Sequence, residues 1–429
     1  MDAQSQVVGR LRSVFLTGVT LPEQFRQAQL NKLMALIKEN EQRILDALHK
    51  DLAKATKLDE CFVRREPLGV VLIIGAWNYP LQLTLNPLIG AIAAGNCAVI
   101  KPSEVSPATE SLLVELIPKY LSQDCYAVVQ GGPEETQALL KNRFDHIFYT
   151  GSQKVARVIM QAASVHLTPV TLELGGKSPC MIFGGVNIRA AVHRLAWAKF
   201  FNAGQSCVAP DYVLCSPATR DAMLPELKVT LEEFYTKNPQ ASPDFCRIVS
   251  PRHWSRLMEL LKRSNGKVIV GGESDEEDKY IAPTVVVDVD EDDALMQEEI
   301  FGPILPIVTV DSVEKGIEFL NGREKPLALY VFSDDSSLVN KVLESTSSGG
   351  FCSNDGIINS GLPSFPFGGV GASGLGSYHG RWGFETFSHR KACMLRGWAL
   401  ERLNGLRYPP YQENKLNWLR WTTSPKNCS

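Results

Sequence analysis

The hydrophobic pattern of the chain changes character near residue 68. Before that point apolar residues recur every three or four positions, as in Leu30, Leu33, Met34 and Ile37, and this spacing predicts an amphipathic helix. Beyond it, short continuous apolar runs are each followed by a turn and a helical pattern, as expected of strands that are buried in a parallel sheet. These runs cover residues 70–74, 97–100, 126–129 and 146–149.

Four strand–turn–helix units within about 90 residues predict a doubly wound α/β sheet. Ligands of such sheets bind beyond the carboxyl ends of the strands. The residues of interest at those ends are Asn78, Lys101, Glu104, Gly131, Gly151 and Ser152. A second α/β stretch follows Gly176, and it contains helices around 190–201 and 223–235 and strands at 212–214 and 268–270.

Composition narrows the class of protein. The chain has 429 residues, 44% of them hydrophobic and 21% charged, which is typical of a soluble protein with two or three domains. The formal net charge of -3, without a basic stripe, argues against a nucleic-acid partner. No apolar run reaches the ~18 residues of a membrane span. Ten scattered cysteines and an opening unlike a signal peptide predict free thiols and a cytoplasmic location.

Cys207 is the first candidate for chemistry, because the small or polar residues Gly204, Gln205 and Ser206 precede it. The sequence predicts a thiol on a loop or at the start of a helix, and a cysteine at a helix N-terminus has a lowered pKa and becomes a nucleophile. By contrast, Cys97 and Cys215 lie in apolar strands and are expected to be inert. Spacing alone leaves a structural role for Cys207 equally open.

Glu173 is the second candidate, because it lies between Leu172 and Leu174 just before a Gly-Gly turn. Burial there would raise its pKa and suit the carboxylate to general-base catalysis. The same segment also allows a structural role, in which Glu173 pairs with Lys177 and stabilises the turn.

Three further turns carry candidate ligand groups. Asn78 places an amide just beyond a strand, where it could donate to an oxyanion or simply form a turn. Thr150–Ser152 follows a strand and opens a helix, an arrangement that favours a pyrophosphate at the helix N-terminus. Gly369–Gly374 matches the dinucleotide motif G-x-G-x-x-G literally. No βαβ unit follows it, however, so we interpret it as a glycine-rich turn.

Taken together, these segments resemble the aldehyde dehydrogenase superfamily, in particular its class 3 branch and the 3B subgroup within that branch. The resemblance covers nearly the whole chain, and it rests on many motifs in the family's order. Those motifs are Pro67–Pro80, Lys101–Glu104, Thr150–Ser152, Glu173–Lys177, Gly204–Cys207, Glu298–Pro303 and Pro366–Gly371, while Leu406–Pro410 indicates class 3.

The resemblance implies a catalytic role for three residues. Cys207 is similar to the family's nucleophile, which adds to the aldehyde carbon and then carries the product as a thioester. Asn78 and the backbone N–H of Cys207 resemble the oxyanion hole. Glu173 is similar to the base that activates the water for hydrolysis of the thioester. No metal is expected.

The resemblance also implies a dinucleotide site. It assigns pairs of residues to the adenosine ribose, the pyrophosphate and the nicotinamide nucleoside, which are Lys101 with Glu104, Gly151 with Ser152, and Glu299 with Phe301. Both NAD and NADP remain open as cofactors, because Glu104 is the only acidic candidate near the ribose and is not diagnostic.

The implied protein is an NAD(P)-dependent enzyme that oxidises medium- or long-chain aliphatic or aromatic aldehydes, including lipid peroxidation products, to carboxylic acids. We expect a homodimer and peripheral membrane contact, with no nucleic acid. The fold expected is that of an aldehyde dehydrogenase, with a Rossmann-type cofactor domain, an α/β catalytic domain and a small β arm for dimerisation. The expected boundaries are 1–57 and 67–175 for the cofactor domain, 176–376 for the catalytic domain, 58–66 and 377–395 for the arm, and 396–429 for the tail.

Three departures from the family pattern stand out. Ala156 replaces a glycine on the cofactor helix, and its methyl group is expected to weaken cofactor binding modestly. The segment between Lys50 and Leu58 lacks roughly 40 residues, including a helix, that relatives have there. The chain stops at Cys428-Ser429, two residues short of a prenylation box, so lipid anchoring through Cys428 is not predicted.

Two other classes of function compete with this interpretation. A cysteine hydrolase would pair Cys207 with a histidine such as His166 or His193 and would need no cofactor. A catalytically impaired scaffold is the alternative suggested by the missing helix near 50–58.

Overall fold

The computed structural model describes residues 14, 17–19, 22–39, 60–395, 405 and 408–410. The chain divides into two compact units, Met1–Arg64 with Lys391–Ser429, and Arg65–Arg390. In the first unit, helix α2 (Glu23–Glu39) confirms the helix predicted around Leu30–Ile37. The shortened segment 50–58, most of the tail 396–429 and Cys428 lie outside the described residues. Among the helices that are described, none combines the length and the apolarity needed to cross a bilayer.

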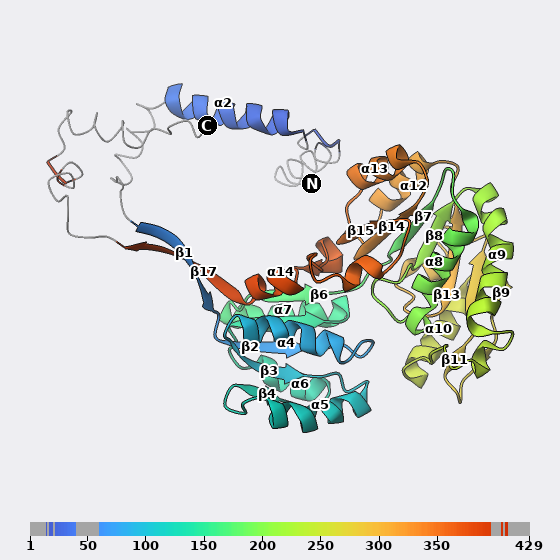
Figure 1. Ribbon diagram of the computed structural model, residues 1–429, viewed down its shortest axis with the longest axis horizontal. Helices are drawn as coiled ribbons and strands as arrows, with labels where there is room; N and C mark the ends of the chain where they lie inside the picture. The colour runs from blue at the N-terminus through green and yellow to red at the C-terminus, as the bar shows by residue number, and fades with distance from the viewer. Residues whose placement is uncertain are drawn as a thin grey trace, which may run out of the picture. The chain divides into compact units, whose positions relative to one another are not determined.

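A six-stranded sheet forms the first layer of the larger unit (Figure 1). Its order is β16-β6-β5-β2-β3-β4, and all neighbours are parallel except β16 and β6. The bounds are β2 (Val70–Ile74), β3 (Cys97–Lys101), β4 (Tyr126–Val128), β5 (His146–Thr150), β6 (Val170–Glu173) and β16 (Gly374–Leu375). The four strands predicted from apolar runs are confirmed as β2, β3, β4 and β5.

Helices cover both faces of this sheet, which explains why its strands are continuous apolar runs. Val71 and Ile73 of β2 pack in one cluster with α4 (Gln82–Ala93), α5 (Pro107–Tyr120) and Phe387. Leu72 and Ile74 point the other way and pack with α6 (Pro133–Leu140) and α7 (Gln153–His166). Because successive side chains of a strand face opposite sides, a strand between two helical layers needs apolar residues at every position.

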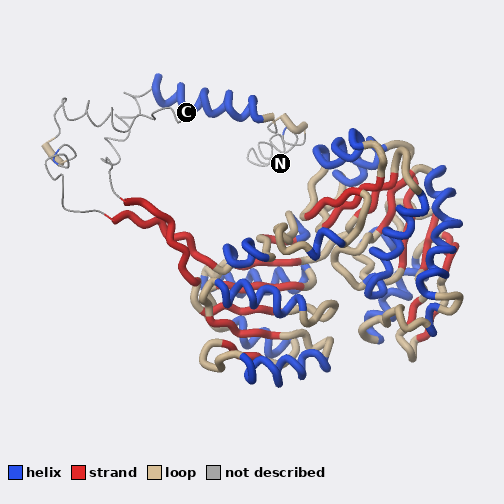
Figure 2. The backbone as a smooth tube through the Cα atoms, in the orientation of Figure 1, coloured by secondary structure: helices blue, strands red, loops and turns tan. Residues whose placement is uncertain are grey.

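A seven-stranded sheet forms the core of the rest of this unit (Figure 2). Its order is β15-β14-β7-β8-β13-β12-β9, with only β9 antiparallel to its neighbour. The strands are β7 (Pro179–Ile182), β8 (Tyr212–Cys215), β9 (Lys267–Val270), β12 (Thr284–Val287), β13 (Ile304–Thr309), β14 (Ala328–Phe332) and β15 (Gly350–Ser353). The helices are α8 (Ile188–Phe200), α9 (Pro217–Tyr235), α10 (Pro251–Arg263), α11 (Ala294–Gln297), α12 (Val313–Asn321) and α13 (Ser336–Ser345). The predicted helices around 190–201 and 223–235 correspond to α8 and α9.

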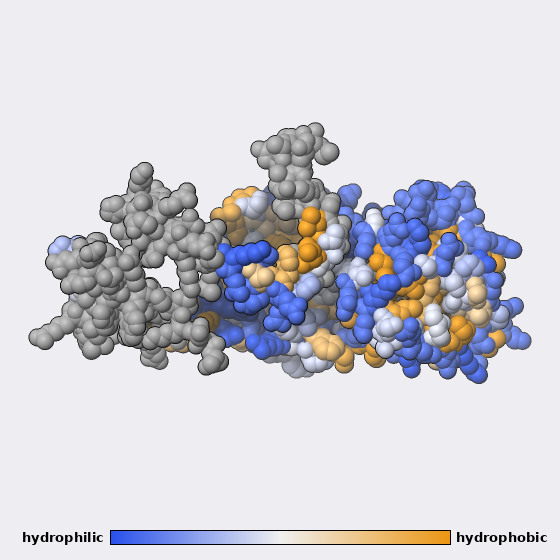
Figure 3. Space-filling view, turned by 90° about the horizontal axis from the view of Figure 1, so that it is seen from above, coloured by the Kyte–Doolittle hydropathy of each residue, from blue (hydrophilic) through white to orange (hydrophobic). Residues whose placement is uncertain are grey.

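The strand pair β1 (Glu60–Pro67) and β17 (Ser388–Leu395) forms a separate two-stranded sheet. The arm was predicted to begin at 377, but the segment before β17 packs on the six-stranded sheet instead. Tyr378 and Phe387 lie in the core of that sheet, and α14 (Gly380–Thr386) contacts α4. On the visible surface, hydrophilic side chains surround scattered hydrophobic patches (Figure 3).

Candidate active site

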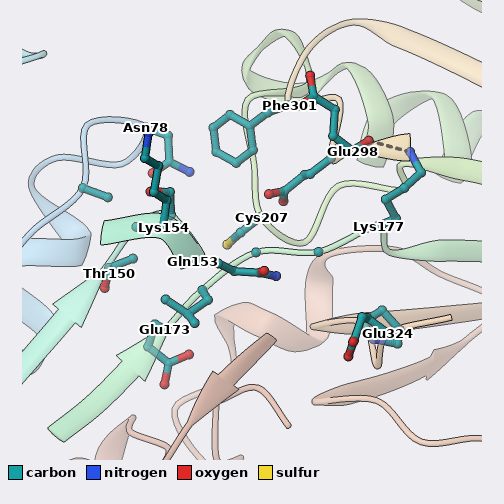
Figure 4. Close-up of a pocket in the computed structure, with 18 of the residues that line it drawn as sticks. Asn78, Thr150, Gln153, Lys154, Glu173, Lys177, Cys207, Glu298, Phe301 and Glu324 are labelled. Atoms are coloured by element: carbon teal, nitrogen blue, oxygen red, sulfur yellow. Dashed lines mark hydrogen bonds between the residues drawn. The ribbon is translucent and has the colours of Figure 1, made fainter. Parts of the chain in front are cut away.

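A cavity lies at the point where the strand order of the six-stranded sheet reverses. From β2 the chain runs to β3 and β4 on one side and then returns to β5 on the other. In such sheets the crevice outside the carboxyl ends of the two diverging strands is the usual ligand site. The segments that follow β2 and β5, at 76–78 and 150–152, line a cavity of about 710 Å³ together with Glu173, Cys207 and Phe301 (Figure 4). The structure therefore brings most of the predicted site residues to one place.

Cys207 lies in a turn that follows the 3-10 helix Phe201–Gly204, and the Gln205 side chain holds this turn in place. The Gln205 amide donates to the Asn202 carbonyl at 3.1 Å and to the Arg247 carbonyl at 2.9 Å, and it accepts from the backbone N–H of Val249 at 2.9 Å. These bonds tie the loop to a segment 40 residues away along the chain. This role of Gln205 was not predicted from the sequence.

Backbone geometry constrains the same loop. Asn202 and Ala203 both have left-handed conformations, with φ of 53° and 51°. Non-glycine residues rarely adopt this conformation, so the surrounding contacts must enforce it. A Cβ atom at Gly204 would lie 2.2 Å from the carbonyl oxygen of Gly302, so only glycine fits at this position. The loop that carries Cys207 therefore packs backbone to backbone against the loop around Gly302.

The environment of Cys207 differs from the prediction. Burial raises the pKa of the thiol to about 12, and the neighbouring carboxyl groups of Glu299 and Glu173 add to the effect. The expected lowered pKa is wrong, because Cys207 follows a short helix rather than beginning one. The two carboxyl groups that add to the shift come from distant parts of the sequence. In this state the sulfur is a thiol.

This raised pKa predicts slow alkylation of Cys207 in the protein without cofactor. A pKa three units above the ordinary value of 9.0 reduces the thiolate fraction at neutral pH by roughly a thousandfold. Iodoacetamide labelling, followed at each cysteine by peptide mass spectrometry, should therefore increase with pH at Cys207 without a plateau below about pH 10. The exposed Cys246 serves as an internal reference. A plateau for Cys207 near neutral pH would contradict the raised pKa.

Asn78 is tied directly to the loop that carries Cys207. Its side-chain amide donates to the Gln205 carbonyl at 3.2 Å, and its own carbonyl accepts from the Asn202 amide at 2.9 Å. Asn78 and Cys207 both line the cavity (Figure 4). An amide N–H donor fixed beside a sulfur nucleophile has the chemistry required of an oxyanion hole.

Glu173 ends strand β6 with its side chain almost completely buried, at 1% exposure. Neither carboxyl oxygen has a hydrogen-bond partner among the described residues, and burial raises its pKa well above the usual range. The predicted burial and pKa shift are confirmed. The alternative pairing with Lys177 is wrong, because the Lys177 ammonium donates to Asp211 at 2.6 Å instead.

The turn Thr150–Ser152 has the features of an anion site. The Ser152 hydroxyl caps helix α7 by accepting from the Val155 N–H at 3.4 Å. A Cβ at Gly151 would lie 2.2 Å from the Tyr149 hydroxyl, so the backbone there must be glycine. The hydroxyl of Thr150 is buried without a partner in the described part of the chain. The backbone N–H groups and the helix dipole at the N-terminus of α7 favour the binding of a phosphate group there.

Cationic side chains also line this cavity. Lys154 and Arg157, in the first turns of α7, line it together with Arg323 and Lys325. Ala156, on the same helix, is 2% exposed and packs in the core between α7 and the sheet. Its methyl group therefore faces the sheet rather than the cavity.

Glu299 and Phe301 lie on the opposite wall. Burial, followed by the charge of Asp211, raises the pKa of Glu299 to about 8, so its carboxyl is mainly protonated at neutral pH. Phe301 has a left-handed backbone with φ of 53°, and its ring packs edge to face on Trp77 with centroids 5.3 Å apart. Trp77 packs in the same way on His253 at 5.0 Å. The sequence did not predict either aromatic contact.

Lys101 and Glu104 form a pair of their own. The Lys101 ammonium donates to Glu104 at 3.1 Å, to the Pro102 carbonyl at 2.7 Å and to the Gly131 carbonyl at 2.6 Å. They lie at the carboxyl end of β3, next to β2 in the sheet, but neither residue lines the cavity that contains Cys207.

The glycine-rich segment Gly369–Gly374 is a turn, as interpreted from the sequence. It forms a short 3-10 helix and then strand β16, which pairs antiparallel with β6 at Glu173. A Cβ at Gly369 would lie 2.2 Å from the Ser373 carbonyl oxygen, so this glycine serves the turn.

The histidines of the hydrolase hypothesis lie elsewhere. His166 ends α7 on the surface, and His193 bonds to Glu233 at 3.0 Å on α9. Neither lines the cavity, so a hydrolase built on Cys207 and either histidine is wrong. Within the described ranges, no group of three or more His, Cys, Asp or Glu side chains could hold a metal ion.

A second cavity of about 370 Å³ has an aromatic wall that the sequence analysis did not identify. It is lined by Tyr79, Trp197, Phe201, Asn202, Phe234, Tyr235, Asp244 and Cys246. Tyr79 follows the oxyanion-hole candidate Asn78 in sequence, and Asn202 belongs to the loop that precedes Cys207. The Tyr79 and Phe201 rings stack with centroids 6.3 Å apart. A signal was present in the sequence, because Trp197 and Phe201 are four residues apart on a predicted helix.

Comparison with known proteins now identifies the class. The model of the aldehyde dehydrogenase family matches residues 17–393. Human aldehyde dehydrogenase family 3 member B1 is 50% identical over 466 aligned positions, which include 100% of this chain and 99% of that protein. Mouse aldehyde dehydrogenase family 3 member B2 is 49% identical, with 98% of this chain and 95% of that protein covered.

Solved structures agree with these relatives. The substrate-bound AldH of Staphylococcus aureus has a TM-score of 0.82 and 41% identity, covering 98% of this chain and 100% of that one. An aldehyde dehydrogenase of Mycobacterium tuberculosis complexed with NAD+ has a TM-score of 0.73 and 31% identity, covering 80% and 74% of the two chains.

The chain belongs to the aldehyde dehydrogenase family, and it is an aldehyde dehydrogenase. Within that family it is a class 3 enzyme most like the 3B members. The alignment with the human relative has 466 positions for a chain of 429 residues, so at least 37 positions face a gap in this chain. This agrees with the shortening that the sequence indicated.

Proposed function

We propose that the protein oxidises medium- or long-chain aliphatic or aromatic aldehydes to carboxylic acids through a thioester on Cys207, with NAD or NADP as the oxidant. The observation that carries this proposal is the convergence of a thiol, an amide and a buried carboxyl, Cys207, Asn78 and Glu173, on one cavity. That cavity also contains an anion-binding helix N-terminus. This combination favours an enzyme over the impaired scaffold.

The first step joins Cys207 to the substrate. The Cys207 thiol loses its proton to water, and the resulting thiolate sulfur forms a bond to the aldehyde carbon while the carbonyl π electrons move to the oxygen, which becomes an oxyanion. The Asn78 side-chain amide and the Cys207 backbone N–H donate to that oxyanion and stabilise it. Burial, with the Glu299 and Glu173 carboxyl groups, raises the pKa of the thiol, so the attacking thiolate is a minor form at neutral pH.

The residues present fit a dinucleotide. The pyrophosphate would lie at Gly151 and Ser152, where the N-terminus of α7 and nearby cations favour negative charge. The unpartnered carboxyl oxygen of Glu299 and the ring of Phe301 would hold the nicotinamide end. A dinucleotide held by these residues would supply the hydride acceptor for the oxidation. Lys101 and Glu104 would hold the adenosine ribose.

Glu173 acts in the second half of the reaction. Its raised pKa makes the ionised carboxylate a stronger base than an ordinary glutamate. It takes a proton from a water molecule, which attacks the thioester carbon, breaks the carbon–sulfur bond and releases the carboxylic acid. The Cys207 sulfur then recovers its proton.

The aromatic cavity supports the substrate class. Its walls contain Tyr79, Trp197, Phe201 and Phe234, which favour long apolar or aromatic groups. Trp197→Ala should raise KM for long-chain and aromatic aldehydes about tenfold while changing KM for propanal much less, because only the larger substrates reach the ring. Trp382→Ala, on α14, is the matched control. Equal changes for short and long aldehydes would rule out this cavity as the substrate site.

The same proposal assigns roles to the domains and to the strand pair β1 and β17. The six-stranded layer, within 67–175, would bind the dinucleotide, and 176–376 would carry the catalytic cysteine. The strand pair β1 and β17 would form a homodimer arm, and peripheral contact with a membrane would give access to lipid-derived aldehydes. The cytoplasm is the expected location.

The proposal is tested with the purified protein and a panel of aldehydes, supplied with either NAD or NADP. Absorbance of the reduced nicotinamide reports turnover, and mass spectrometry of the quenched reaction locates the acyl group. We expect reduction only when aldehyde and cofactor are both present, with the acyl group on the peptide that contains Cys207. Turnover with no adduct on that peptide would contradict the mechanism.

A further inference from the structure

A buried carboxylate lies between two lysines behind the wall of the cavity. Asp211, just before strand β8, is 4% exposed. Its carboxylate accepts from the Lys177 ammonium at 2.6 Å, and the Lys199 ammonium lies 4.0 Å away on its other side. Lys199 ends helix α8 with 0% exposure, and its ammonium has no hydrogen-bond partner in the described part of the molecule. Burying these charged groups costs free energy, because they lose their hydration.

The same carboxylate holds the loop at 298–301. The backbone N–H of Ile300 donates to both Asp211 oxygens, at 3.1 and 3.3 Å. Lys177, which pairs with Asp211, also donates to the carbonyls of Leu295 at 2.7 Å and Glu298 at 3.0 Å (Figure 4). Backbone groups on both sides of Glu299 are therefore fixed by one buried ion pair.

This loop needs such fixation. Phe301 adopts a left-handed backbone, which a bulky residue keeps only where its surroundings enforce it. Arg256 adds a contact to the Glu299 carbonyl at 3.3 Å from the solvent side. The carbonyl of Gly302 packs against Gly204, so the position of this loop also constrains the loop that carries Cys207.

We propose that Asp211 is a positioning residue for the oxidation reaction: held between Lys177 and Lys199, it fixes the 298–301 loop so that Glu299 and Phe301 face the cofactor. The proposal rests on the assignment of Glu299 and Phe301 to the nicotinamide end. The Lys199 ammonium is the second positive charge beside Asp211, 4.0 Å from its carboxylate. A buried ion pair is seldom worth more to stability than apolar residues of equal size, so a positional role accounts for its presence better.

The test compares Asp211→Asn with the double variant Asp211→Asn/Lys199→Met. The comparison separates the effect of Asp211 on the position of the 298–301 loop from its effect on the net charge of the buried cluster. The single variant leaves the two lysines without an anion, so we expect a lower melting temperature and at least a tenfold rise in KM for the dinucleotide. The double variant removes the excess positive charge, but it still lacks one of the two carboxylate oxygens that accept from Lys177 and from the Ile300 N–H. We therefore expect it to recover melting temperature while KM stays high. Recovery of both, or an unchanged KM in the single variant, would overturn the proposal.

Two further variants complete the design. Asp221→Asn removes an exposed carboxylate that pairs with Arg220 at 2.8 Å, and it should leave KM unchanged as the matched control. If both Asp211 variants fail to fold, Lys177→Met removes the contacts to Leu295 and Glu298 and should raise KM by a similar factor. An unchanged KM there would count against the proposal equally.

Glu299→Gln distinguishes this inference from the proposed function. If it leaves KM for the dinucleotide unchanged, the assignment of Glu299 to the cofactor is wrong, whatever Asp211→Asn does. If it raises KM while Asp211→Asn does not, the cofactor site stands and only the positioning role fails.

Discussion

Cys207→Ala is expected to lower dehydrogenase activity by at least about a thousandfold, because no other group can form the covalent bond to the aldehyde carbon. The change removes one sulfur atom from a half-buried site, so the fold should be retained. Steady-state rates with each cofactor measure the loss. The melting temperature with and without NAD shows whether binding persists, because a ligand that binds only the folded state stabilises it.

Cys125→Ala is the matched control for this variant. Cys125 is also half-buried, but it lies just before strand β4 and does not line the cavity. Activity should be unchanged there. Full activity in the Cys207 variant would show that the thioester mechanism is wrong, while loss of the NAD-dependent stabilisation would indicate a disturbed cofactor site instead.

Glu173→Gln is expected to separate the two halves of the reaction. Thioester formation does not use the carboxylate, so one equivalent of reduced cofactor per active site should still appear in a rapid burst. Hydrolysis loses its base, so the steady-state rate should fall by roughly a hundred- to ten-thousandfold. Glutamine has nearly the same volume as glutamate, so the fold around this buried position should be retained. Rapid mixing with absorbance detection measures both phases.

The accumulated acyl group provides the second readout for Glu173→Gln. Mass spectrometry of the quenched variant should find the peptide of Cys207 mainly acylated, in contrast to the wild type. Glu232→Gln, an exposed glutamate on α9, is the control and should turn over normally. A variant that loses the burst together with the steady state would place Glu173 before the thioester and contradict its role in hydrolysis.

The sequence predicted the six-stranded sheet well because its strands are buried on both faces. The run 70–74 contains apolar residues at every position, and the structure explains this by helices on either side. The seven-stranded sheet was predicted only in part, at β8 and β9. Its other strands were not recognised, because short apolar runs fit a buried helix as well as a strand. The sequence did not indicate that the segment after residue 377, which was assigned to the arm, packs on the six-stranded sheet. Tyr378 and Phe387 belong to the core of that sheet, whose strands β2 to β5 lie more than 200 residues earlier in the chain.

At the site, the sequence predicted those properties that depend on neighbouring residues in the chain. Glu173 was expected to be buried because leucines flank it, and it is. The pKa of Cys207 was predicted in the wrong direction, because its controlling carboxyls lie at positions 173 and 299 and only the fold brings them close. Asp211 and Lys199 were missed for the same reason, since their partners are far away in the sequence. The sequence did contain a signal for this buried pair, because one charged residue lies within each of two apolar runs, 195–200 and 208–214.

The protonated state of the Cys207 sulfur has a consequence for chemical damage. Peroxides convert the ionised form of cysteine to sulfenic acid far more readily than the neutral form, and further oxidation is irreversible. With burial and two acidic neighbours raising its pKa to about 12, the resting sulfur is protected from such attack. The nucleophile would thus stay intact between turnovers.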